Sequence, residues 1–322
     1  MRILKLFVGV LLGCLLSGGL INAQDYPVKG VRLVVPYPPG GATDLIARGL
    51  AKYLADKWGK PVIVDNRGGA AGIIGAEAVS RAAPDGYTLM LSDSSPFVIA
   101  PHLQANMPFN PLTAFAPITI VARQSQVLAV GEKIPATNVK ELVLYLKANP
   151  GTTYGSFGEG STNHVLTEEF ARLTGTQLVH IPYKGTGAVI PDLLSGRIGI
   201  YFGSLGVLEP YEKAGKLKLL AVTNEKRLPF RPDLPTFNES DLPGLVVSLW
   251  MGLVAPAGTP PEILGKIQRD VSEILLDRTF VDQILSPQTL IPGGDSREGF
   301  GAQLRQDTAR WGSLVKGIGL KP

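Results

Sequence analysis

Apolar and polar positions are arranged along the first part of the chain in blocks that have the lengths of strands and helices. Apolar runs at 31–35, 62–64 and 87–91 predict buried strands. Apolar residues recur at helical spacing over 44–58, and small residues dominate 70–82, which predicts a helix in each of these gaps. Strands that alternate with helices indicate a parallel sheet with helices on its faces.

The same order of elements is repeated later in the chain. Strands are predicted at 152–154, 178–180 and 198–202, with helices after the first two. In both copies a glycine-containing loop, 36–44 or 155–162, leads from the first strand into the first helix. The unpaired N–H groups and the dipole of a helix N-terminus favour anions. Two such units therefore predict a cleft that holds a small anionic molecule from both sides.

The segments around these units predict how two lobes are connected. Residues 118–130 are extended, and we place the first crossing between lobes at 123–125. The proline-punctuated loop at 226–245 returns the chain to the first lobe. We expect an α/β fold with two Rossmann-like lobes joined by a hinge, as in a Venus flytrap. The expected lobes are 24–124 with 248–322, and 125–247, the latter including a return linker at about 225–247.

Residues 1–23 have the pattern of a signal peptide. Arg2 and Lys5 precede an apolar run at 6–16, and Ala23 provides a small residue for cleavage before Gln24. The apolar run is too short to span a membrane comfortably. A lipoprotein anchor at Cys14 is the alternative, although the apolar residues that follow would make a poor soluble tether.

Removal of this segment changes the composition in a way that excludes several classes of protein. The net charge falls from +4 to +2 (4 − 2, without Arg2 and Lys5), and the only cysteine is lost. The mature chain then has no disulfide, no thiol nucleophile and no thiolate metal site. Its near-neutral charge argues against a nucleic-acid partner. The remaining 299 residues (322 − 23) suffice for two domains.

Catalytic motifs are absent from the sequence. It contains no Gly-x-Ser-x-Gly elbow, no His-Glu-x-x-His and no Walker phosphate loop, and Gly69 to Gly72 lacks the dinucleotide spacing. His164 lies close enough to Ser161 for a Ser/His pair, but a packed helix residue is the simpler interpretation, and His180 fits a strand near the cleft. We therefore predict a binding protein without enzymatic activity, metal or cofactor.

Hydroxyls, backbone amides and glycine loops supply the candidate ligand contacts. Asp44 either orients the first loop or caps the helix that follows it. Serines follow the third strand of each unit, where the open edge of a parallel sheet faces a cleft, and Lys184 is either a ligand contact or a solvated charge. In the first lobe the predicted contacts are Tyr37, Pro39, Gly40, Gly41, Ala42, Thr43, Asp44, Gly69, Ser92, Ser94 and Ser95. In the second lobe they are Ser156, Phe157, Gly158, Gly160, Ser161, Thr162, His164, Tyr183, Lys184, Gly203 and Ser204.

Several of these motifs together resemble the substrate-binding receptors of tripartite tricarboxylate transporters, also called Bug receptors. The resemblance rests on 36–44, on 66–72 with 84–89, on 180–185, on 213–223 and on 254–260, and it spans nearly the whole mature chain in order. It implies a monomeric periplasmic binding protein of type II fold that closes around an organic carboxylate. The first loop would hold one carboxylate through backbone amides and bridging waters. The receptor would deliver its ligand to a membrane permease, although some members act in sensing instead.

One departure from the family pattern concerns the ligand. Many relatives carry an acidic residue in the strand where this chain has Arg197 to Phe202 without one. An ammonium group would need that acid, so the resemblance favours a mono- or dicarboxylate without an amine, aromatic acids included.

Overall fold

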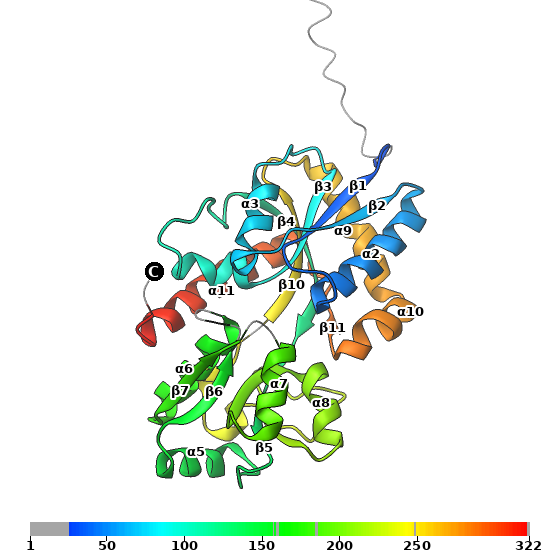
Figure 1. Ribbon diagram of the computed structural model, residues 1–322. Coiled ribbons are helices and arrows are strands. Elements are labelled where there is room, and N and C mark those ends of the chain that lie inside the picture. The colour runs from blue at the N-terminus through cyan, green and yellow to red at the C-terminus, as the bar shows by residue number, and fades with distance from the viewer. Residues whose placement is uncertain (1–25, 157, 159–160, 184–185, 248, 321–322) are drawn as a thin grey trace, which may run out of the picture.

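The computed structural model describes residues 26–156, 158, 161–183, 186–247 and 249–320, which form two lobes, each built on its own sheet (Figure 1). The first sheet has the strand order β11-β4-β10-β3-β1-β2 and the second β7-β6-β8-β5-β9. The strands of the first sheet are β1 (Val31–Val35), β2 (Val62–Asn66), β3 (Thr88–Asp93), β4 (Phe115–Gln124), β10 (Leu249–Pro256) and β11 (Ile291–Pro292). Those of the second are β5 (Gln126–Gly131), β6 (Thr152–Ser156), β7 (Leu178–Pro182), β8 (Ile200–Ser204) and β9 (Leu217–Val222).

Helices connect the strands and cover both faces of each sheet. Around the first sheet they are α2 (Ala42–Trp58), α3 (Ile73–Ser80), α4 (Ser95–Val98), α9 (Pro261–Leu276), α10 (Arg278–Phe280) and α11 (Arg297–Gly317). Around the second they are α5 (Val139–Ala148), α6 (Thr162–Thr174), α7 (Thr186–Ser195) and α8 (Leu205–Lys213). Shorter 3-10 turns are η2 (Ala70–Gly72), η3 (Ala100–His102), η4 (Asn238–Ser240), η5 (Pro243–Leu245) and η7 (Ser286–Gln288), and η6 (Val281–Leu285) is a π-helix. In the described part of the chain, no helix combines the length and the apolar character that a membrane span requires.

The repeated unit that the sequence predicts is confirmed. In the first lobe β1 lies between β2 and β3 and is parallel to both. In the second lobe β6 lies between β7 and β8 in the same way. Both units therefore have the topology β-α-β-α-β with the first strand in the middle.

The strands of the two predicted units are parallel as expected, but each sheet also contains antiparallel strands, so both sheets are mixed. In the first sheet β10 is antiparallel to β3 and to β4. In the second sheet β5 is antiparallel to β8 and to β9. These are the strands next to the two crossings, where the chain enters a sheet from the opposite lobe. Hydrophobic periodicity reports which face of a strand is buried but not its direction.

Alternation along the strands builds a core on each side of each sheet. Leu33 and Val35 pack with α2 and α9, whereas Val34 faces the opposite core with α3 and α11. In the second sheet Leu128 belongs to the core that continues from the first lobe, and Val127 belongs to a separate core with α7 and α8. The C-terminal helix α11 also lies against α6, so the lobes are in contact outside the crossings.

The chain passes between the sheets twice. Strand β4 ends at Gln124 and β5 begins at Gln126, so Ser125 is the first crossing. The return runs from Val222 to Leu249 through η4 and η5. The lobe limits at 124/125 and 247/248 stay a prediction, and the predicted signal peptide lies outside the described residues.

Gly252 in β10 allows two aromatic side chains to pack over the first sheet. A methyl group there would overlap the ring of Phe300 and lie 2.9 Å from Trp250 Cζ3, and both rings are fully buried. We expect Gly252→Ala to lower the free energy of unfolding by about 1–3 kcal/mol through overpacking. Gly265→Ala is the control, because its methyl would meet only Arg269 Nη1 at 3.5 Å on α9 and should stabilise the helix by about 0.5–1 kcal/mol. Urea unfolding checks both variants, and equal stabilities would contradict this account of the core.

Candidate functional site

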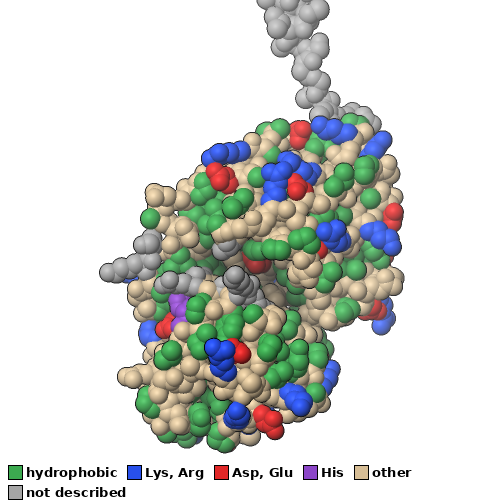
Figure 2. All heavy atoms as spheres, viewed as in Figure 1, with side chains coloured by type: hydrophobic (Ala, Val, Ile, Leu, Met, Phe, Trp, Pro, Cys, Tyr) green, Lys and Arg blue, Asp and Glu red, His purple; other side chains and the backbone are tan. Residues whose placement is uncertain are grey.

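A cavity of about 910 Å³ lies between the lobes, where the space-filling view shows the surface hollowed (Figure 2). Its size is within the range of small-molecule sites. The first lobe contributes Tyr37, Pro38, Gly40–Thr43, Leu45, Gly69, Gly72, Asp93–Ser95, Ile99, Ala100, Leu103, Gln104, Leu249, Met251, Pro287, Gln288 and Leu290. The second contributes Ser161–Asn163, Gly187, Ser204, Gly206 and Val207, and Gln124 and Gln126 flank the first crossing.

The loop between β1 and α2 forms one wall of this cavity, and Asp44 holds its shape. The carboxylate of Asp44 accepts hydrogen bonds from Gly40 N (2.9 Å) and Asn66 Nδ2 (2.9 Å). Arg48 Nε donates to the same carboxylate at 2.9 Å. Burial acts to raise the pKa of Asp44, but the hydrogen bonds from Arg48, Gly40 and Asn66 hold it below its ordinary value. Asp44 therefore remains ionised and orients the loop.

The alternative role for Asp44, capping the helix, is wrong. Helix α2 begins at Ala42 with Gly41 at its N-cap, and no described side chain caps it. A Cβ added at Gly40 or Gly41 would meet no atom within 4 Å, so the space in front of these residues is open. The first-turn N–H groups of α2 are thus available beside the cavity, as helix N-termini without caps generally are.

The second lobe presents two further helix N-termini to the cavity. Ser161 is the N-cap of α6, and its hydroxyl accepts from His164 N while donating to Gly158 O at 2.7 Å. Asn163 in the first turn of α6 donates to Phe202 O of β8. Ser204 is the N-cap of α8, which no described side chain caps.

Among the described lining residues, positive potential comes from these backbone ends rather than from side chains. No Lys, Arg or His is among the described lining residues, and Asp93 is the one acid among them. Asp93 Oδ1 accepts from Tyr37 Oη (2.7 Å) and Ser95 N (2.8 Å). Burial raises the pKa of Asp93, and the bonds from Tyr37 and Ser95 only partly oppose this. The arrangement can hold an anion through amides and hydroxyls.

Comparison with known proteins places this architecture in a family. The model of the tripartite tricarboxylate transporter family receptor matches residues 46–320. The chain belongs to this receptor family. It is 34% identical over 305 residues to Protein BugT of Bordetella pertussis, covering 94% of this chain and 93% of that protein.

Solved structures of similar proteins give the same result. The chain superposes on R. palustris Rpa4515 with adipate at a TM-score of 0.83 and 33% identity, covering 92% of this chain and 99% of that one. MatC from Rhodopseudomonas palustris, solved with bound malate, gives a TM-score of 0.78 and 28% identity, covering 90% and 100%. The predicted fold class, two lobes of the type II periplasmic binding protein kind, is confirmed. The protein is a periplasmic solute-binding receptor rather than an enzyme.

Half of the predicted contacts of the receptor are brought together in the cavity, and their contact with a ligand stays a prediction. Those that line it are Tyr37, Gly40, Gly41, Ala42, Thr43, Gly69, Ser94, Ser95, Ser161, Thr162 and Ser204. Phe157, Gly160 and Lys184 lie outside the described residues.

The other predicted contacts do not line the cavity, and most have a structural partner instead. In the first lobe, Pro39 is exposed, and Asp44 is held by the hydrogen bonds described above. Ser92 is buried, and its Oγ lies 3.5 Å from Tyr37 Oη. In the second lobe Tyr183 Oη donates to Asp192 (2.6 Å), and burial raises the pKa of this phenol to about 12. A Cβ at Gly203 would clash with Tyr201 and Leu208.

A stacked cluster of rings supports the α6 loop from behind. The rings of His164 and His180 lie 4.3 Å apart, and Tyr154 stacks on His180 at 5.0 Å. Ser156 Oγ lies 2.5 Å from His180 Nε2 and accepts from Gly158 N at 3.0 Å. His164, Ser156 and Gly158 are not among the lining residues of the cavity, and the Ser161 hydroxyl is engaged by His164 N and Gly158 O.

Sequence reasoning missed several lining residues. From the sequence, Asp93 is not singled out between the serines, and Gln124 is placed only in the first crossing and Gln126 only in the extended run 118–130. Gly206 is a further lining residue that the sequence analysis does not identify, because its close approach to Gln288 of the other lobe depends on the assembled fold. In the described part of the chain no group of three or more His, Cys, Asp or Glu side chains is placed to hold a metal.

The network around Asp44 can be tested by Asp44→Ala, which leaves Gly40 N and Asn66 without their acceptor. We expect this variant to unfold with about 1–3 kcal/mol less free energy than wild type at neutral pH. The folded pKa of Asp44 is lowered, so its contribution is fully present above the unfolded value of 3.8 and is lost as pH falls through the folded value.

Asp56→Ala on the same helix is the matched control, because Asp56 is exposed and has no hydrogen bond in the structure. Its stability should stay within about 0.5 kcal/mol of wild type. Denaturant titrations at several pH values would contradict the assignment if both variants lost the same free energy, or if the loss at Asp44 did not shrink in acid.

Proposed function

We propose that this receptor captures a small organic carboxylate between its lobes and delivers it to the permease subunits of a tripartite transporter. The observation that carries the proposal is the uncapped N-terminus of α2 beside a cavity whose described lining contains no Lys or Arg. Such a terminus binds carboxylates through backbone N–H groups and the helix dipole. The relatives solved with adipate and with malate support a carboxylate ligand.

Residues of both lobes would contact the ligand. The carboxylate would lie against the amides of Gly41 to Thr43, with bridging waters where direct contact is too long. Ser161 and Thr162 of the second lobe would donate from the opposite side. The apolar body of the ligand would pack against the described aliphatic lining: Ile99, Leu103, Val207, Leu249, Met251 and Leu290.

The receptor would be exported and would close over its ligand. Residues 1–23 would direct a monomeric chain to the periplasm and be removed. The lobes, 24–124 with 248–322 and 125–247, would close as nearly rigid bodies about Ser125 and the segment after Thr223. Closure is favoured only by contacts that the ligand makes with both lobes at once.

Carboxylates should stabilise the receptor. A ligand that binds only the folded state adds RT ln(1 + [L]/Kd), about 2.7 kcal/mol at one hundred times Kd. Thermal unfolding in the presence of a panel of short aliphatic and aromatic carboxylates should therefore reveal at least one that raises the Tm by several degrees. Stabilisation by sugars, metals or nucleotides alone would overturn the proposal.

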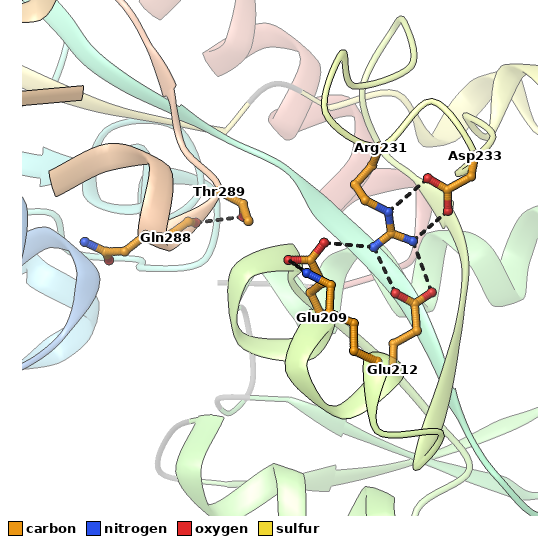
Figure 3. Close-up of polar contacts among 7 residues, drawn as sticks. Glu209, Glu212, Arg231, Asp233, Gln288 and Thr289 are labelled. Atoms are coloured by element: carbon orange, nitrogen blue, oxygen red, sulfur yellow. Dashed lines mark hydrogen bonds and ion pairs between the residues drawn. The ribbon is translucent and has the colours of Figure 1, made fainter. Parts of the chain in front are cut away.

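Closure also depends on a contact between α8 and η7. A Cβ at Gly206 would lie 2.6 Å from Gln288 O, a carbonyl of the other lobe. The close-up shows Gln288 and Thr289 on one side and the ion-pair cluster of Arg231 on the other (Figure 3). Arg231 bonds Glu212 and Asp233 and lies 3.2 Å from Glu209, which fixes α8 to the return segment. α8 therefore cannot shift easily to make room for a side chain at 206.

We expect Gly206→Ala to weaken ligand binding at least several-fold by opposing closure. Because alanine suits a helix better than glycine, the unliganded variant should be no less stable than wild type. Isothermal titration with the best carboxylate of the panel would measure the affinity, and Gly265→Ala on α9 serves as the control with unchanged binding. Wild-type affinity in Gly206→Ala would show that the two lobes do not meet at this point when ligand is bound.

A further inference from the structure

We infer that Asp93 is a specificity-determining residue that accepts hydrogen bonds from a donor group on the carboxylate ligand, an ammonium group above all. The inference rests on the proposed function and narrows its substrate class to carboxylates that also carry a donor. It reverses the expectation of a ligand without an amine, which depended on the second lobe alone.

The position of Asp93 gives it access to a bound molecule. It ends β3 in register with Met251 of β10, and both residues line the cavity. The residue is half-buried and lines the cavity, both Tyr37 Oη and Ser95 N donate to its Oδ1, and the Ser95 hydroxyl is a further donor. An ionised carboxylate offers about four acceptor positions on its two oxygens. These donors do not occupy all of them, so Asp93 can still accept from a bound molecule.

The balance of charge in the cavity favours a cationic donor. No described lining residue is a Lys or Arg that could neutralise Asp93. Asp44, by contrast, has Arg48 at 2.9 Å and is not among the lining residues. A second carboxylate on the ligand would be repelled by Asp93, whereas an ammonium group would be attracted. Burial raises the pKa of Asp93 and so disfavours its charged form, whereas an ammonium group beside it would favour the charged form.

A second acceptor in the cavity independently indicates a ligand with donors. Gln126 is 5% exposed and lines the cavity. Its Oε1 has no hydrogen-bond partner among the described residues. A buried carbonyl oxygen without a donor costs free energy that a ligand N–H or O–H would recover. The cavity thus offers amides at α2 for a carboxylate and acceptors at Asp93 and Gln126 for donors.

The test compares carboxylates that carry an ammonium or hydroxyl donor with matching carboxylates that carry none. Wild-type receptor is titrated with γ-aminobutyrate, γ-hydroxybutyrate, butyrate and succinate, with norleucine and hexanoate, and with glutamate and glutarate. We expect the amino member of at least one set to bind about tenfold or more tightly than its partner without a donor, with the hydroxy acid between them. Equal affinity within every set that binds, or preference for the member without a donor, would overturn the inference without any variant.

Asp93→Asn then separates a contact with the ligand from a structural role. Asparagine keeps an oxygen for Tyr37 and Ser95 but removes the charge. The variant should bind the amino acid about tenfold more weakly and the matching acid without a donor as well as or better than wild type. Asp65→Asn removes the same charge from β2, where Asp65 pairs with Arg67 outside the cavity, and should leave both affinities unchanged.

Equal weakening of both ligand types in Asp93→Asn would show that Asp93 only shapes the loop through Tyr37 and Ser95, and would overturn the inference. Unchanged binding of both would do the same. If wild type bound no carboxylate in any set, the proposed function itself would fail, which is a different result from carboxylate binding without preference for a donor. If Asp93→Asn did not fold, the wild-type comparison would still decide.

Discussion

The site depends on one geometric constraint, the direction of the β-α connection. A helix that follows a parallel strand begins at the carboxyl end of that strand, so its free N–H groups point beyond that edge of the sheet. α2, α6 and α8 all follow this rule, after β1, β6 and β8, and their N-terminal ends line the same cavity. An anion can thus be held by groups that the backbone has already fixed, without ordering long cationic side chains.

The crossings between the lobes have an unusual concentration of unpaired polar atoms. Among the described residues, Ser125 Oγ, Gln126 Oε1, Thr223 Oγ1 and Asn224 Oδ1 are buried without a hydrogen-bond partner. The two crossings are joined directly by Thr223 N donating to Gln126 O at 2.9 Å. Rotation about this region would break few side-chain hydrogen bonds, whereas the cores on either side are densely apolar. The predicted hinge would therefore act where few side chains are hydrogen-bonded, between two lobes with packed apolar cores.

Features set by local sequence were predictable, and those set by contacts between distant segments were not. The helix at Pro261–Leu276 and the strand at Leu217–Val222 follow from periodicity and from Pro261 in the first turn. The loop 36–44 was recognised because glycines and prolines mark the turn. The direction of β10 and the helix α8, which contains Pro210, were missed. The lining role of Asp93 and Gln126 arises only when β3 of the first sheet and β5 of the second border the same cavity, and spacing along the sequence does not indicate this.

Two aspartates of the first lobe differ in their electrostatic environment and therefore in their role. Asp44 and Asp93 both lie near the first loop, but the pKa of one is lowered and that of the other is raised. Asp44 has Arg48 as a partner and uses its charge to hold Gly40, so its field is largely neutralised before it reaches the cavity. Asp93 receives only neutral donors, Tyr37 and Ser95, and no described Lys, Arg or His of the cavity lining offsets the burial that raises its pKa. An acid whose charge the protein does not balance is one that a ligand is better placed to balance.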